Sequence, residues 1–157
     1  MSTSDAPLEP KLGKTLQFMQ LLWELTHALQ SLSKRMEGAI GITGPQRLAL
    51  RIIGRRPGIA AGELSSAMRI HPSTLTGILR RLEERRAVRR EPDPEDARRM
   101  HLYLASAGKD LDRERGGTVE AAVQRALRQV DARDIEGARR VLRAVIDELA
   151  REAGEED

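Results

Sequence analysis

Residues 60–82 read AAGELSSAMRIHPSTLTGILRRL, and this stretch decides the fold of the chain. Its second half repeats apolar side chains at the i, i+3, i+4 and i+7 spacing, which places one apolar stripe along a helix. The members of the stripe are Leu75, Ile78, Leu79 and Leu82. A shorter apolar pattern from Leu64 to Met68 predicts a helix before it, with residues 69–71 as a tight connection. Two helices joined in this way suit insertion of the second helix into the major groove of DNA.

The face of the second helix that lies opposite the apolar stripe carries hydroxyl and guanidinium groups. The helix is predicted to span residues 72–86, because its proline is well tolerated in a first helical turn. Hydroxyls near a helix start can bind phosphates, and arginine can bind guanine through two hydrogen bonds. The candidate DNA-contacting residues here are Arg69, His71, Ser73, Thr74, Thr76, Arg80 and Arg81. Taken alone, such a helix is more often an ordinary solvated surface helix, so the residues that follow carry the argument.

Two short strands are predicted after this helix, at residues 87–91 and 100–104. The residues between them, 92–99, read PDPEDARR, which is typical of a turn that ends in two arginines. A basic hairpin beside a recognition helix can reach the adjacent minor groove, where narrow A·T-rich segments attract arginine. The candidate DNA-contacting residues of this hairpin are Asp96, Arg98 and Arg99. The carboxylate of Asp96 can orient Arg98 through a charge-assisted hydrogen bond.

The stretch from Ser73 to Glu84, followed by residues 88–90 and 93–108, resembles the MarR family of winged helix-turn-helix transcriptional regulators. In the wing of that family, an Asp is followed two residues later by an Arg and then by an alternating strand that ends near a Gly. These positions are matched by Asp96, Arg98, Leu102, Leu104 and Gly108. The resemblance implies that Arg98 enters the minor groove with Asp96 as its partner. The family's recognition-helix hydroxyl positions are matched by Ser73, Thr74 and Thr76.

Two positions depart from the family pattern. Many members carry a basic residue where this chain has Gly77, and many carry an acidic residue where it has Arg80. The operator sequence therefore cannot be inferred from that of any relative. The resemblance extends over nearly the whole chain in layout, and its specific motifs lie between about residues 43 and 108.

The predicted fold is mainly α with a small β-wing, in which a winged helix-turn-helix core is flanked by N- and C-terminal dimerisation helices. Residues 1–10 are expected to form a flexible N-terminal arm, and residues 11–157 a single MarR-like domain. Within that domain, the winged-helix core is expected at residues 43–105 and the dimerisation helices at 11–40 and 106–150.

The first of these helical regions carries apolar residues on more than one face, which suggests that a second subunit covers part of it. The second region is expected to begin with one helix from Ser106, its cap, to about Val130, with a bend or hinge at Gly116–Gly117 and a turn at 131–134. In MarR-like proteins these helices build a symmetric dimer, so the resemblance implies a homodimer that reads an inverted repeat. A coiled-coil scaffold is the alternative, and the glycine pair and the short heptad run argue against it.

The resemblance also implies a repressor that is released from double-stranded DNA by a small aromatic or anionic effector. Such ligands bind between the dimer helices and the winged core in MarR-like proteins. The residues of the first helix that could line a cleft of this kind are Phe18, Met19, Trp23 and His27. The same spacing also describes an ordinary core, so both interpretations stay open.

Charge is distributed unevenly along the chain. Residues 45–108 hold 13 Lys and Arg against 7 Asp and Glu, whereas residues 109–157 hold 10 against 13. The excess of positive charge therefore coincides with the helix-turn-helix and the hairpin. This coincidence supports a polyanionic partner.

The chain of 157 residues contains no cysteine, which excludes disulfides, Cys-ligated zinc and a thiol sensor. Its histidines, His27, His71 and His101, show no metal-binding or catalytic spacing, and His101 is expected at the surface. No cofactor, metal site or catalytic group is expected. A long apolar run and a signal-like start are absent from the sequence, so a cytoplasmic protein without membrane contact is the default. A winged helix that binds another protein and an enzyme on a helical scaffold are the alternatives to a DNA-binding regulator.

Overall fold

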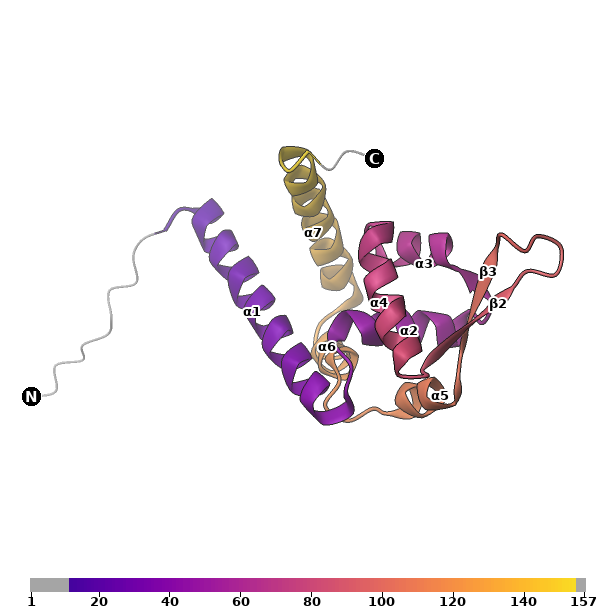
Figure 1. Cartoon of the computed structure of the whole chain (residues 1–157). Helices are drawn as coiled ribbons and strands as arrows, with labels where there is room; N and C mark the ends of the chain where they lie inside the picture. Colours follow the sequence, from indigo (N-terminus) through magenta and orange to yellow (C-terminus); the bar gives the residue numbers. More distant parts are fainter. Residues whose placement is uncertain (1–11, 155–157) are drawn as a thin grey trace, which may run out of the picture. The chain divides into compact units, whose positions relative to one another are not determined.

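The computed structural model describes residues 12–154 and consists mainly of helices, with one small sheet (Figure 1). The arm predicted at residues 1–10 lies outside the described residues. The chain divides after Glu114 into two compact units, which are described separately. The first unit contains α1 (Lys14–Ile40), α2 (Gly44–Arg55), β1 (Ile59–Ala60), α3 (Ala61–Met68), α4 (Pro72–Glu84), β2 (Val88–Pro92), β3 (Met100–Leu104) and α5 (Ser106–Arg113), and the second contains α6 (Val119–Leu127) and α7 (Ala132–Glu152).

A local cap fixes the beginning of α2. The Thr43 side chain accepts a hydrogen bond from the backbone N–H of Gln46 at 3.4 Å, and Oε1 of Gln46 accepts one from the backbone N–H of Thr43 at 3.0 Å. Each residue thus satisfies a backbone donor that the first helical turn leaves without a partner. Pro45 lies in that first turn, where proline is well tolerated.

The beginning of α4 is fixed in the same way by His71. Nδ1 of the His71 ring accepts a hydrogen bond from the backbone N–H of Ser73 at 3.2 Å, and Pro72 is the first helical residue. The predicted start of this helix is therefore confirmed. The helix ends at Glu84 and not at residue 86, because the chain turns through a left-handed residue, Arg86, with φ 54°.

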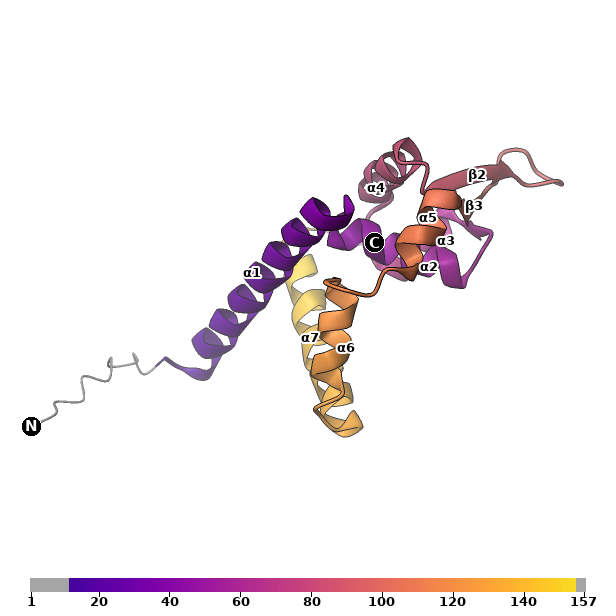
Figure 2. The same cartoon turned by 90° about the horizontal axis from the view of Figure 1, so that it is seen from below.

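The sheet has three antiparallel strands in the order β1-β3-β2, so that β3 is paired on both sides. Val88 pairs with Leu104, and Pro92 pairs with Met100, which brings the two predicted wing strands into a regular hairpin. This hairpin extends beyond α2, α3 and α5 in both views (Figure 1, Figure 2). The sequence does not predict β1, since its two residues are too few for an alternating pattern.

The core of the first unit lies between α2, α3, α4 and the sheet. The apolar stripe predicted on α4 is buried there, as the spacing of its leucines requires. Each fully buried leucine stabilises the unit by roughly 1.5–3 kcal/mol. The buried apolar residues are Ile42, Ala49, Leu50, Ile53, Ile59, Leu64, Leu75, Leu79, Leu82, Ala87, Val88 and Leu102.

Two arginines of α2 hold α5 against this core. The side chain of Arg47 is 1% exposed and donates to the backbone carbonyl oxygens of Leu111 and Glu114. One turn later on α2, Nη1 of Arg51 lies 2.6 Å from Oδ1 of Asp112. The last turn of α5 therefore finds hydrogen-bond donors for its carbonyl oxygens on another helix.

The single helix expected from Ser106 to about Val130 is wrong, because the chain breaks between α5 and α6. Glu114 has extended backbone angles, and Gly117 has φ 66°, so helical hydrogen bonding cannot continue through this segment. The glycine pair thus marks an interruption and not a bend. Ser106 is the first helical residue and not the cap, which is Ala105 without a side-chain hydrogen bond.

The second unit consists of two helices, of which α6 has a side-chain cap and α7 does not. Thr118 caps α6 by accepting from the backbone N–H of Ala121 at 3.3 Å, and α7 begins directly after Asp131. The turn predicted at residues 131–134 lies earlier in the chain, at residues 128–131, and residues 132–134 are helical. Large apolar side chains on both helices are exposed, and these are Val123, Leu127, Val141, Ile146 and Leu149.

Candidate nucleic-acid interface

The outer face of α4 presents the polar side chains that the sequence assigns to DNA. Ser73, Thr74, Thr76 and Arg80 are exposed, while Leu75, Leu79 and Leu82 on the opposite face are buried. The hydroxyl of Thr76 donates to the carbonyl oxygen of Pro72 at 3.0 Å. Nε of Arg80 lies 3.8 Å from Oε1 of Glu84, and this pair is exposed enough for a phosphate or base to compete with it.

Gly77 lies on the same helix with no heavy atom within 4 Å of the position that a β-carbon would occupy. The helix backbone is therefore bare at this point, and another surface can approach it closely. A side chain would fit there without a clash inside the chain. The lack of a side chain at Gly77 therefore affects how closely a binding partner can approach the helix, and not the packing inside the chain.

The other candidate residues near α4 do not share its outer face. Arg69 caps the end of α3 in a left-handed conformation with φ 54°, and His71 caps α4. Arg81 lines a cavity of about 270 Å³ together with Glu37 and Gly41 at the end of α1. Arg81 is therefore placed beside α1, while Arg80 faces outward.

The loop between β2 and β3 is organised by two aspartates. Oδ1 of Asp93 accepts hydrogen bonds from the backbone N–H groups of Glu95 and Asp96, at 2.7 and 3.1 Å. Oδ1 of Asp96 accepts one from the backbone N–H of Arg98 at 3.1 Å. These bonds shape the loop as two successive side-chain-to-backbone turns.

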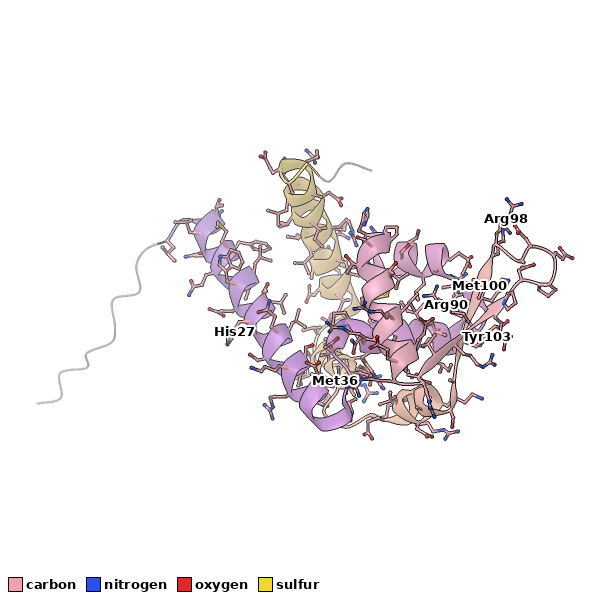
Figure 3. All side chains as sticks on the ribbon, viewed as in Figure 1. His27, Met36, Arg90, Arg98, Met100 and Tyr103 are labelled. Carbon is pink, nitrogen blue, oxygen red and sulfur yellow. The ribbon has the colours of Figure 1, made fainter. Side chains whose placement is uncertain are left out.

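The predicted pairing of Asp96 with Arg98 is present in the structure, and Arg99 shares the same carboxylate. Nε of Arg98 lies 3.5 Å from Oδ1 of Asp96, and Nε of Arg99 lies 3.9 Å from its Oδ2. The Arg98 side chain is 95% exposed and lies at the end of the hairpin, beyond Met100 (Figure 3). The carboxylate of Asp96 is thus paired with two largely exposed guanidinium groups, those of Arg98 and Arg99.

His101 is half-buried, so the prediction that it lies at the surface is wrong. Its Nδ1 lies 2.6 Å from the carbonyl oxygen of Gly58, and its Nε2 lies 2.7 Å from Oδ2 of Asp93. The hydrogen bond with His101 is the largest cause that lowers the pKa of Asp93 to about 2, followed by the bonds from Glu95 and Asp96. The hydrogen bond with Asp93, and then that with Gly58, raises the pKa of His101 above its ordinary value.

Two further contacts tie the hairpin to the rest of the unit, and sequence reasoning missed both. Arg90 on β2 donates to the carboxylate of Glu83 on α4, which links the wing to the recognition helix. The guanidinium of Arg89 lies 4.9 Å from the centre of the Tyr103 ring, across the hairpin. Arg90 and Tyr103 are labelled on the hairpin in Figure 3. An Arg–Glu pair seven residues apart gives no periodic signal, because its members lie on different elements.

The residues predicted to bind an effector all lie on α1, but at about 100° per residue Phe18 and His27 are on opposite sides of the helix. Trp23 is 68% exposed and Met19 is 43% exposed, while Phe18 is half-buried and His27 exposed. A cavity of about 440 Å³ lies elsewhere in the unit, between α2, β3 and α5. Its lining includes Ile53, Pro57, Arg89, Tyr103, Lys109 and Arg113.

Neither a metal-binding cluster nor a membrane-spanning helix is present in the described part of the chain. Within residues 12–154, no group of three or more His, Cys, Asp or Glu side chains is arranged to hold a metal ion. None of the helices in this range is long and apolar enough to cross a membrane.

The known proteins that resemble this chain include transcriptional regulators of one family. Residues 42–100 match the model of the MarR family. An HTH-type transcriptional repressor of Mycobacterium tuberculosis is 29% identical over 93 residues, which cover 59% of this chain and 67% of that protein. The crystal structure of MarR has a TM-score of 0.62 at 25% identity and covers 96% of this chain and 100% of its own. The MepR–DNA complex of S. aureus has a TM-score of 0.69 at 19% identity and covers 84% of this chain and 97% of its own.

Proposed function

Since the chain belongs to the MarR family of winged helix-turn-helix transcriptional regulators, we propose that it acts as a dimeric repressor that reads an inverted-repeat operator and is released by a small molecule. Like its family and its relatives, it is a DNA-binding regulator. It is not an enzyme. In this proposal, α4 enters the major groove and the loop at residues 92–99 enters the minor groove. Ser73, Thr74, Thr76 and Arg80 contact bases or phosphates from α4, with Arg69, His71 and Arg81 near its ends.

The main support for the proposal is the arrangement of Arg98 and Asp96 in the wing. Arg98 is almost fully exposed at the end of a hairpin, and Asp96 holds both its backbone N–H and its guanidinium. An arginine kept outward by a carboxylate is already ordered for a narrow minor groove, so less conformational entropy is lost when DNA binds. Arg99 shares the same carboxylate and adds a second cation.

The homodimer is supported by apolar side chains that this chain leaves exposed. On α1 these include Leu16, Leu21, Trp23 and Leu25, and α7 adds Leu149 at 61% exposure. Clusters of large apolar side chains at a surface are typical of protein interfaces. A two-fold dimer would present its recognition helices to half-sites about 34 Å apart, which is one turn of the duplex.

The experiment that tests this function is binding to a duplex from the region upstream of the protein's own gene, compared with a random duplex over a salt series. A saturable complex of one dimer that prefers the upstream duplex by about 10³-fold or more would support the proposal. Equal weak binding to both duplexes, lost together as salt rises, would instead indicate only a basic surface.

Replacing Arg98 with alanine is expected to weaken operator binding by about 1–3 kcal/mol, because a groove contact is lost. The free energy of unfolding should stay unchanged, since the side chain is 95% exposed. Arg139→Ala is the matched control, because Arg139 is also exposed and paired with a carboxylate, 3.3 Å away on Glu136. Titration of labelled operator with each variant measures the difference. An equal effect of the two substitutions would contradict a specific role for Arg98.

The effector is proposed to bind beside α1, where Phe18, Met19, Trp23 and His27 lie. Trp23 is the single tryptophan of the chain, so its fluorescence reports on this helix without interference. A compound that releases the operator is expected to change Trp23 emission at the same concentration at which it releases DNA. Emission that is insensitive to every releasing compound would place the effector elsewhere.

A further inference from the structure

The ring of His101 stands between two oxygen atoms that can only accept hydrogen bonds. Nδ1 faces the carbonyl oxygen of Gly58 at 2.6 Å, and Nε2 faces Oδ2 of Asp93 at 2.7 Å. A neutral imidazole carries one N–H and can donate to one of the two, whereas an imidazolium donates to both. Asp93 cannot supply the missing proton, because its low pKa keeps it a carboxylate. Two acceptors facing the two ring nitrogens therefore favour a doubly protonated ring.

The charged groups around the ring favour this form. Asp93 contacts it from the wing loop, and Glu63 on α3 acts on it from a distance, although Glu63 is itself paired with Arg56 at 3.3 Å. Glu91 lies opposite His101 on β2 and is paired with Arg89. The carboxylates nearest the ring raise its pKa, and partial burial opposes them without cancelling the rise. The side chain is 28% exposed, so solvent can exchange its protons.

The same contact begins a chain of hydrogen bonds that ends at the DNA-facing arginines. The second oxygen of Asp93 accepts from the backbone N–H of Asp96 at 3.1 Å, and Asp96 accepts from the backbone N–H of Arg98. The backbone N–H of Asp93 also donates to the carbonyl oxygen of Arg99 at 2.8 Å, which closes the base of the loop. Gly58 belongs to the turn after α2, so the ring fastens this loop to the body of the unit.

We propose that His101, as an imidazolium, is a positioning residue of the wing: while the ring is protonated, it fastens Asp93 to Gly58 and so orders the loop that presents Arg98 and Arg99 to DNA. This inference rests on the proposed role of the wing and adds a dependence of operator affinity on pH. The direction follows from the raised pKa of His101: the contact is complete at acidic pH and is lost as the pH rises through that pKa. Operator affinity is therefore highest at low pH.

The first test is operator binding by the wild type and by His101→Gln between about pH 6 and about pH 9. Wild-type affinity is expected to fall about fivefold over this range, which is a moderate value for one partly exposed charge-assisted contact. His101→Gln should bind at every pH about as the wild type does at the alkaline end, because glutamine does not titrate. His71→Gln removes the other ring near DNA and is expected to keep the pH dependence, whatever its affinity. A His101→Gln profile that falls like that of the wild type would overturn the inference.

The second test needs no DNA and separates this inference from the proposed function. In the free protein, NMR follows the His101 ring together with the backbone amides of Asp96 and Arg98 as the pH is raised. All three are expected to shift with one midpoint above the ordinary histidine value, and the amide shifts should vanish in Asp93→Asn. Amides that ignore the ring titration would overturn the positioning role even where the operator is bound. Coupled amides with an Arg98→Ala variant of unchanged affinity would instead refute the proposed contact of the wing with DNA.

Discussion

Replacing Gly108 with alanine is expected to lower the free energy of unfolding of the first unit by about 3 kcal/mol, the upper end of what overpacking costs. A β-carbon at this position would lie 1.9 Å from the carbonyl oxygen of Ala87 and 2.8 Å from its carbonyl carbon. That oxygen accepts the backbone N–H of Ala105 at 2.9 Å, so moving it away would break the contact that joins β2 to the start of α5. Relief by a side-chain rotation is impossible, because both clashing atoms belong to the backbone.

Urea unfolding of Gly108→Ala measures this loss, with Gly38→Ala as the matched control. Gly38 is also helical, and no heavy atom lies within 4 Å of its added β-carbon. The control should gain about 0.5–1 kcal/mol, since alanine is the better helix former. Unfolding midpoints that move in the same direction for both variants would contradict the tight contact at Gly108.

Replacing Arg47 with methionine is expected to cost about 2–4 kcal/mol of unfolding free energy, because hydrogen bonds from a charged donor are lost in a buried place. Arg47 is 1% exposed and donates to the carbonyl oxygens of Leu111 and Glu114 at the end of α5. Methionine fills a similar volume and offers no donor. The last turn of α5 should therefore loosen, and hydrogen exchange of its amides should accelerate.

Arg51→Met is the control for this prediction. Arg51 lies on the same helix and binds the same partner helix through Asp112, with the two side chains 20% and 26% exposed. A partly exposed ion pair contributes about 1 kcal/mol or less. Equal losses for the two variants would mean that burial of Arg47 adds nothing to its contribution.

The elements with local signals were predictable from the sequence. Thr43 and Pro45 fix the start of α2, Pro72 fixes that of α4, and the alternation of Leu102 and Leu104 places β3. Each of these signals acts within a few residues of its own position. The exposure of Arg98 and its pairing with Asp96 belong to the same class, since only two residues separate them.

What the sequence could not predict depends on contacts between distant residues. The partners of Arg47 on α5 lie 64 and 67 residues away, and the break after α5 follows from that anchoring as well as from the glycine pair. The ring of His101 is hydrogen-bonded to the carbonyl oxygen of Gly58, 43 residues earlier in the chain. A periodic pattern of apolar residues contains no information about contacts between residues this far apart in the chain. The strand β1 was missed for a different reason, because two residues cannot alternate.

The strand order β1-β3-β2 also determines how the sheet behaves at high concentration. Each outer strand pairs with β3 on one side only, and such edges can recruit the same edge of another copy. Here β1 has only two residues, and β2 ends in a proline after the charged side chains of Arg89, Arg90 and Glu91. Short, charged or proline-bearing edges resist strand addition. The arginine-rich hairpin that suits DNA thereby also protects the protein against sheet-to-sheet aggregation.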